Sequence, residues 1–231
     1  MKNKRAQSLE DAVKIVKDGA TVLIGGFGPP GVPEILIDGI CDNKIKNLTI
    51  VTNNAGTDRS GVARLMDEGC VSKLICTFPW AKESFVFKEL YDAGKLQLEI
   101  VPQGTLAERM RTAGAGLGGF LTPTAVGTDL AEGKQIHKVN GTDYILELPL
   151  RGDVALIKAL KADKRGNLIY NKSARNFNPI MAMAADQTIV EVSEEVEIDE
   201  LDPEVIITPS VFVDSYFVTG HYEVGKGSKQ T

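Results

Sequence analysis

The stretch TVLIGGFGPPGVP, residues 21–33, joins three features that together indicate a fold class. Residues 21–24 form a short apolar run of the kind found in a buried strand. A loop rich in glycine and proline follows at 25–31. Pro33 then suits the first turn of a helix that carries Ile35, Leu36, Ile37 and Ile40. A strand that runs through a tight loop into a helix is the repeating unit of parallel α/β sheets.

The same alternation surrounds this stretch in the first half of the chain. A helix over Ser8–Lys17 is predicted to open with a capping box formed by Ser8 and Asp11. Further strands are predicted at Leu48–Thr52, Lys73–Cys76 and Gln97–Val101, with helices at Arg59–Glu68 and Lys82–Ala93 between them. The pattern predicts an α/β fold with an open, mostly parallel sheet flanked by helices.

The second half adds a small antiparallel extension and more strands. Gln135–Val139 and Tyr144–Leu148 flank an Asn140-Gly141 turn, which predicts a hairpin. The remaining predicted elements are strands at Val154–Leu160, Leu168–Tyr170 and Thr188–Val192, a helix at Asn178–Ala185, and a solvated acidic face or loop at Ser193–Glu204. With no linker or repeat, we expect one domain over residues 1–231, with a frayed polar tail at 225–231.

Composition argues against several classes of protein. The 231 residues include 31 acidic and 26 basic side chains, a net charge of −5, which disfavours binding to nucleic acid or to an anionic membrane surface. No apolar run is long enough for a membrane span, and the start of the chain does not resemble a secretory signal. The three cysteines, Cys41, Cys70 and Cys76, form no C-x-x-C pair. We therefore expect a reduced, cytoplasmic protein with no metal site.

Three loops at predicted strand ends are candidate ligand sites, because ligands of open α/β sheets bind beyond the carboxyl ends of the strands. The glycine loop, Gly25–Pro33, precedes a helix N-terminus that favours an anion or a developing oxyanion. Asn53-Asn54-Ala55-Gly56 offers two neutral amides, although Asx turns or a helix cap explain it equally well. In Pro102-Gln103-Gly104 the Gln103 side chain is predicted to project from a strand end, with Thr105 capping the next helix.

Other motifs are absent or misleading. Residues 114–119 (GAGLGG) fit G-x-G-x-x-G, but a helix-like segment precedes them and Pro123 follows, so they are not a dinucleotide fingerprint. We expect a loop over the site there instead. The chain contains neither a P-loop motif nor a G-x-S-x-G nucleophile elbow.

Several runs of the sequence also resemble a known protein family. Residues 18–33 (DGATVLIGGFGPPGVP) resemble the signature of the first subunit of 3-oxoacid (class I) CoA-transferases. Further runs that resemble this family are Asn53–Gly56, Pro102–Arg109, Thr122–Thr124 and Lys172–Asn178. Together they cover most of the chain, from about residue 9 to residue 213.

The resemblance implies transfer of CoA from an acyl-CoA, such as succinyl-CoA or acetyl-CoA, to a 3-oxo acid, such as 3-oxoadipate or acetoacetate, or to a short-chain fatty acid. In such enzymes a glutamate carries the CoA as a thioester in a ping-pong mechanism, with no cofactor. That glutamate lies in a Ser-Glu-Asn-Gly motif of the second subunit. The motif is absent from this chain, because Glu195 and Val196 follow Ser193-Glu194. The resemblance therefore implies an A (alpha) subunit that needs a B subunit, in a hetero-oligomer of two of each or a multiple.

By the same resemblance, Gln103 lies beside the partner's glutamate. Asn53 and Asn54 hold the acyl carboxylate or the oxyanion, and Gly25, Gly26, Phe27 and Gly28 shape the acyl and pantetheine end. The acceptor acid is left open, with Arg59, Arg109, Arg151 and Arg175 as candidate cations for a second carboxylate. Alternatives are a sugar-phosphate isomerase or ligand-sensing domain of similar fold, or a non-catalytic scaffold.

Overall fold

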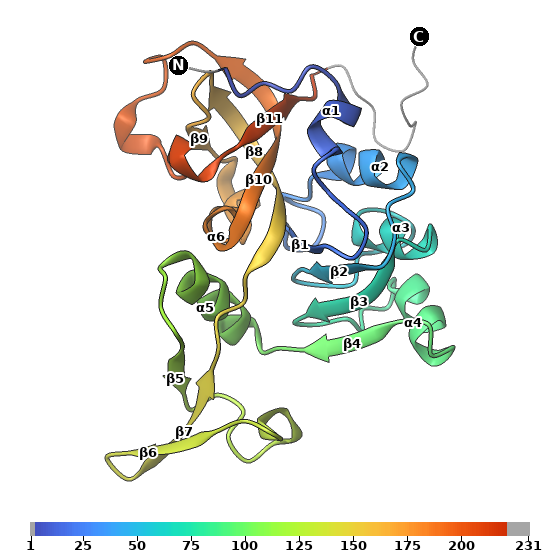
Figure 1. Ribbon diagram of the computed structural model, residues 1–231, viewed down its shortest axis with the longest axis vertical. Helices are drawn as coiled ribbons and strands as arrows, with labels where there is room; N and C mark the ends of the chain where they lie inside the picture. The colour runs from blue at the N-terminus through green and yellow to red at the C-terminus, as the bar shows by residue number, and fades with distance from the viewer. Residues whose placement is uncertain (1–2, 221–231) are drawn as a thin grey trace.

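The computed structural model describes residues 3–220, and its centre is one large, almost wholly parallel sheet (Figure 1). Its strand order is β11-β10-β8-β1-β2-β3-β4, and β9 pairs with β8 antiparallel. The strands are β1 (Thr21–Ile24), β2 (Leu48–Val51), β3 (Val71–Cys76), β4 (Gln97–Ile100), β8 (Gly152–Asp163), β9 (Leu168–Ile169), β10 (Ala185–Val196) and β11 (Ser215–Val218). The predicted fold class is confirmed.

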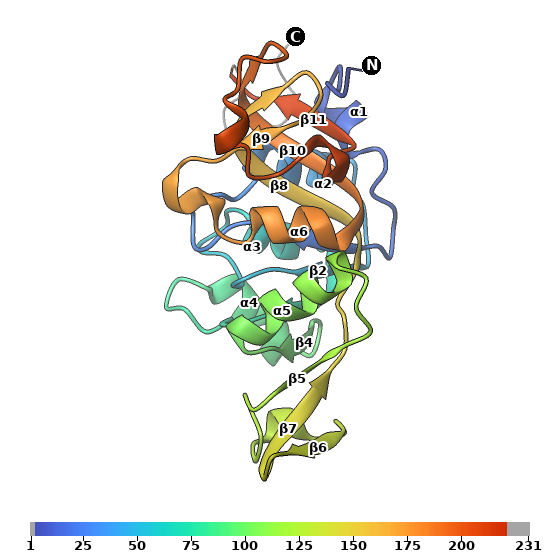
Figure 2. The ribbon, with the colours of Figure 1, turned by 90° about the vertical axis from the view of Figure 1, so that its left-hand side faces the viewer.

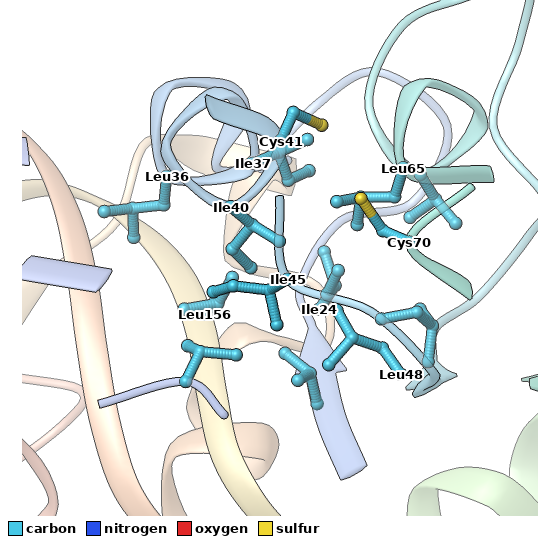
Figure 3. Packing of buried hydrophobic residues seen from close by; sticks show 14 of the residues in the cluster. Ile24, Leu36, Ile37, Ile40, Cys41, Ile45, Leu48, Leu65, Cys70 and Leu156 are labelled. Carbon is cyan, nitrogen blue, oxygen red and sulfur yellow. The ribbon is translucent and has the colours of Figure 1, made fainter. Parts of the chain in front are cut away.

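Helices cover both faces of this sheet because successive residues of each buried strand point to opposite sides. Val22 and Ile24 of β1 pack in the core under α1–α4, whereas Leu23 packs in the core under α5 and α6. Figure 2 shows α5 and α6 together on one face, and Figure 3 shows the packing under α2. The helices are α1 (Leu9–Val13), α2 (Glu34–Asp42), α3 (Val62–Asp67), α4 (Phe85–Asp92), α5 (Gln103–Gly114) and α6 (Asn178–Ala184).

Strand β1 is the point in the sheet at which the order of the strands reverses. Residues 21–23 pair with β2 on one side, and residues 22–24 pair with Val154–Leu156 of β8 on the other, both parallel. The first half of the chain thus builds the sheet outward through β2, β3 and β4, and the second half builds it through β8, β10 and β11. A ligand crevice is expected beyond the carboxyl end of the strands at such a switch point, which is where the loop after β1 lies.

A small antiparallel sheet projects away from the main sheet, as Figure 1 shows. It has the order β5-β7-β6, with β5 (Phe120–Thr122), β6 (Ile136–Val139) and β7 (Thr142–Glu147). β6 and β7 form the predicted hairpin, with Val139 opposite Thr142. Short 3-10 helices are η1 (Asp129–Ala131), η2 (Lys172–Arg175), η3 (Pro203–Val205) and η4 (Ser210–Phe212).

Several predicted boundaries were wrong. Helix α1 ends at Val13, although Ser8 does accept a hydrogen bond from the Asp11 N–H at 3.0 Å. β10 continues to Val196, so the acidic stretch begins inside a strand, because long pairing with β8 outweighs local charge. β11 was not predicted. The predicted single domain and the frayed tail at 225–231 extend outside the described residues and stay predictions. No helix within residues 3–220 is long and apolar enough to cross a membrane.

Candidate active site

The loops that follow β1, β2, β3 and β4 lie along one edge of the sheet, because neighbouring strands in this half are all parallel. Gly26 and Gly28 from the first loop and Asn54 from the second line one small cavity, of about 30 Å³. Thr52 and Glu34 also line it. Such a volume holds one or two waters and no larger group. Residues of the first two loops thus meet at this edge, and their role in binding a substrate stays a prediction.

The two asparagines differ in their surroundings. Asn53 is buried and donates its side-chain amide to Oγ1 of Thr77, at 3.1 Å, while its backbone carbonyl accepts from the Thr77 N–H at 3.0 Å. Asn54 is half-buried, and its Oδ1 accepts from the Gly56 N–H at 2.9 Å. This last bond is the Asx turn that was one of the two explanations for the motif. Asn54 is the amide that lines the cavity.

Gln103 is not at a strand end but is the first residue of α5. Pro102, not Thr105, is the residue before this helix, and Thr105 is buried within it. Two strand spacings, roughly 10 Å, separate the ends of β2 and β4 because β3 lies between them. The Gln103 side chain is exposed and has no hydrogen bond within residues 3–220. The structure thus puts Gln103 on the same edge as Asn53 and Asn54, and within residues 3–220 no hydrogen bond joins its side chain to either of them.

The glycine loop is closely packed against the segment that precedes α6. A Cβ on Gly25 would lie 1.9 Å from Oδ1 of Asn178, and a Cβ on Gly31 would lie 2.4 Å from the Ala174 carbonyl oxygen. Neither position has room for a side chain. Phe27, by contrast, is 52% exposed at the loop's outer side. The loop therefore exposes an apolar ring to solvent, while its backbone packs against residues 174–178.

The helix N-terminus after this loop is already occupied. Oε2 of Glu191, on β10, accepts from the Ile35 N–H at 2.7 Å and from the Leu36 N–H at 3.4 Å. Lys158 lies 2.7 Å from the other carboxylate oxygen. The expectation that the first amides of α2 bind a substrate anion is wrong, because a carboxylate of the chain itself fills that place.

Glu34 is a partly buried carboxyl at the cavity wall. One oxygen accepts from the Gly61 N–H at 2.8 Å. Burial raises the pKa of Glu34 above its ordinary value; the hydrogen bond from Gly61 opposes this, and the carboxylates of Glu191 and Asp38 add to it. The cavity thus has a carboxyl that holds its proton to higher pH than a solvated one.

Three of the four candidate arginines are already paired. Arg59 pairs with Asp67, Arg151 with Asp186, and Arg109 with Glu99. Arg175 is exposed in η2, and within the described residues it has no carboxylate partner. Residues 114–119, at the far end of α5, lie a helix length of roughly 18 Å from Gln103. They line no part of the cavity, and a helix precedes them as expected. That they form a loop over the site stays a prediction.

Sequence reasoning missed Thr77, Glu34 and Glu191 as residues of this region, and it noted Asn176 only within the run Lys172–Asn178 that resembles the family. Thr77 had a usable signal, because it directly follows a predicted strand whose carboxyl end lies at the same edge. Glu34 directly follows Pro33 and could have been noticed as a charge at the start of an apolar helix. Glu191 and Asn176 reach this region from more than a hundred residues along the chain, and no local pattern indicates that.

Comparison with known proteins names the family. The protein-family model described as coenzyme A transferase matches residues 6–217 of this chain. The A subunit of the 3-oxoadipate CoA-transferase of Acinetobacter baylyi is 57% identical over 213 residues, covering 92% of this chain and 93% of that protein. The A subunit of the probable succinyl-CoA:3-ketoacid coenzyme A transferase of Bacillus subtilis is 46% identical over 224 residues, covering 97% and 93%.

A solved structure agrees with this assignment at the level of the fold. The acyl-CoA transferase of E. coli O157:H7, in a thioester complex with CoA, superposes with a TM-score of 0.84 at 20% identity. The match covers 99% of this chain and 52% of that one, so this chain spans about half the length of that protein. From the matched model and the two relatives, the chain belongs to the coenzyme A transferase family and is of the A (alpha) type.

Proposed function

We propose that this chain is the A subunit of a two-subunit CoA-transferase that moves CoA from succinyl-CoA or acetyl-CoA to a 3-oxo acid or a short-chain fatty acid. CoA is a substrate of this reaction, which uses no cofactor. The observation that carries the proposal is the grouping of the glycine loop, Asn54 and Gln103 at one strand-end edge of a coenzyme A transferase chain.

In the proposed reaction, a glutamate of the B subunit supplies the nucleophile. Its carboxylate oxygen attacks the thioester carbonyl carbon, the C–S bond breaks, and CoA leaves as a thiolate. The acyl-glutamyl anhydride that forms is then attacked by the thiolate at the glutamyl carbonyl, which releases the donor acid as a carboxylate. The acceptor acid takes the CoA by the same steps in reverse.

This chain would bind and orient the reacting groups. The Asn54 amide and the exposed Gln103 amide are neutral donors, which stabilise a developing oxyanion without forming an ion pair with the attacking carboxylate. Phe27 would cover the pantetheine end and keep water from the anhydride. Asn53 would act indirectly, because its own side chain is buried against Thr77.

The acceptor is proposed to be 3-oxoadipate, with acetoacetate as the second candidate. Support comes from the identity to the 3-oxoadipate enzyme of Acinetobacter baylyi. Arg175 is the proposed cation for a second carboxylate, since the other three candidates are paired. The isomerase, ligand-sensing and scaffold alternatives are less favoured, because family membership indicates CoA transfer.

The test is a transfer assay with succinyl-CoA or acetyl-CoA as donor and 3-oxoadipate, acetoacetate or acetate as acceptor. It is run on this chain alone and on the chain co-expressed and co-purified with a B subunit. We expect activity only in the pair, and a CoA adduct on the B chain by mass spectrometry after incubation with donor. Activity of the isolated chain, or an adduct on it, would overturn the split site.

A further inference from the structure

The side chain of Asn176 joins the two ends of the glycine loop. Its Oδ1 accepts from the Gly26 N–H at 3.1 Å, and its Nδ2 donates to the Pro30 carbonyl at 2.9 Å. These partners lie about 150 residues away in the chain and on either side of Phe27. One amide therefore fixes the separation between the start and the end of the loop.

Asn178 completes the attachment from a fully buried position. Its Oδ1 accepts from the Lys158 N–H of β8 at 2.9 Å. Its Nδ2 donates to the Gly31 carbonyl at 3.1 Å and to the Ala174 carbonyl at 2.9 Å. The loop is thus hydrogen-bonded through this segment to β8, the strand of the second half that pairs with β1.

The backbone at Asn176 is held in an unfavourable conformation. Its φ of 22° and ψ of −119° lie outside the regions that residues with a Cβ ordinarily adopt. A residue in such a conformation destabilises the fold and persists only where its surroundings impose it. Glycine would relieve this strain, yet the sequence has an asparagine, whose side chain makes both loop contacts. An amide thus stands at a position where the backbone alone favours glycine.

The same segment also reaches the helix that begins with Gln103. Asn178 is the first residue of α6, and α6 packs on α5 so closely that a Cβ on Gly114 would lie 2.7 Å from Cβ of Met183. Residues 176–184 therefore contact both elements that carry the candidate site groups, the glycine loop and α5. A shift of this segment would move both elements.

We propose that Asn176 is a positioning residue, which holds the glycine loop in the shape that receives the acyl-CoA. It acts through the Gly26 N–H and the Pro30 carbonyl and does not touch the substrate. This inference rests on the proposed function. It extends the transfer machinery of this chain from the strand-end loops to the segment that packs behind them.

The test uses Asn176→Gly in the co-purified two-subunit protein, because this change removes both loop hydrogen bonds while relieving the backbone strain. We expect the thermal midpoint to stay within a few degrees of the native value, since the two effects oppose each other. We expect kcat/KM for the acyl-CoA to fall on the order of 100-fold, because a misplacement of about 1 Å at a reacting group costs that much. Asn171→Gly, an exposed asparagine just before η2, is the matched control and should leave both unchanged.

Hydrogen–deuterium exchange of the peptide containing residues 25–32 gives a readout independent of activity. Faster exchange in Asn176→Gly than in the Asn171→Gly control is expected. Unchanged exchange, or faster exchange with native kinetics, would overturn the positioning role while leaving the proposed function intact. A native pair that transfers no CoA to any of the acids would overturn the proposed function, and this inference with it.

Discussion

Oε2 of Glu191 accepts a hydrogen bond from the Ile35 N–H at 2.7 Å, which joins β10 to the first turn of α2. The two residues are 156 positions apart, and the carboxylate is almost fully buried. A negative charge at a helix N-terminus is stabilising, and this one also balances Lys158. The contact fixes the helix that follows the glycine loop to the other half of the sheet.

Removing this carboxylate should destabilise the fold. In Glu191→Ala the first amides of α2 and the ammonium of Lys158 lose their partner. Breaking a buried pair costs about 3–5 kcal/mol, but Lys158 keeps about a third of its side chain in water. We therefore expect a loss of about 2–3 kcal/mol in the free energy of unfolding, measured by urea denaturation.

The control for this experiment is Glu194→Ala on the same strand. Glu194 is exposed and pairs with Lys161 at 2.9 Å, and such surface pairs contribute roughly 0–1 kcal/mol. Equal losses in the free energy of unfolding would show that the contact between Glu191 and α2 stabilises the fold no more than a surface ion pair does.

Gln103→Ala should lower the activity of the assembled enzyme without changing its stability. Loss of a preorganised oxyanion donor costs about 10²–10³ in rate. The Gln103 side chain is exposed and makes no hydrogen bond within the described residues, so its removal should leave stability unchanged. Steady-state kinetics and a thermal melt of the same sample check both parts. Gln97→Ala, at the opposite end of β4, is the control and should change neither the rate nor the thermal midpoint.

Gly25→Ala should be poorly tolerated. The new methyl group would meet Oδ1 of Asn178 at 1.9 Å, and overpacking of this kind costs about 1–3 kcal/mol. In Gly104→Ala, within α5, nothing lies within 4 Å of the added methyl, so a gain of up to about 1 kcal/mol is expected. Denaturant midpoints of the two variants should move in opposite directions, and a shared direction would contradict the close packing at Gly25.

Glu34 should make stability depend on pH. Because burial raises its pKa, the folded state binds the proton more tightly than the unfolded state does, so ionisation destabilises the protein as pH rises through the folded-state pKa. Glu34→Gln removes that charge and keeps an acceptor for the Gly61 N–H. The thermal midpoint of the variant minus that of the native protein should increase as the pH is raised from roughly 4 to roughly 7. A difference between the two midpoints that does not change with pH would contradict the effect of burial on Glu34.

The cysteines should react slowly in the folded protein. Cys41, Cys70 and Cys76 are all buried, and burial raises the pKa of the Cys76 thiol to about 12. Because burial keeps the reagent away from all three thiols, labelling by a disulfide reagent at about pH 8 should be far slower than in denaturant, and at Cys76 the raised pKa also keeps the reactive thiolate scarce. Rapid reaction of one thiol in the native state would contradict its burial.

Much of the fold was predictable because local signals and the tertiary structure agree. The strand Thr21–Ile24 was predicted with its observed bounds, and the hairpin at Asn140-Gly141 followed from turn chemistry. β11 was missed because Ser215–Val218 is short and mixed in character, and its pairing with β10 gives it strand structure. Helix α1 was predicted too long because a capping box locates the start of a helix and not its end.

The site was predictable only in part, because local signals locate the strand ends but do not reveal contacts between distant residues. Glycines and amides after apolar strands indicated the edge, and the parallel sheet placed them there. The structure adds the contacts between distant residues, such as Asn176 with Gly26 and Glu191 with Ile35. Such contacts depend on how the two halves of the sheet meet, which the composition of either segment does not encode.

One pairing constrains how the chain can fold during synthesis. The backbone of residues 4–6 is hydrogen-bonded to Tyr216, with the Tyr216 N–H donating to the Lys4 carbonyl and the Ala6 N–H donating to the Tyr216 carbonyl. Tyr216 leaves the ribosome more than 200 residues after Lys4. The outer edge of the sheet therefore stays open during elongation, and it is a surface that chaperones or other nascent chains can reach until β11 emerges.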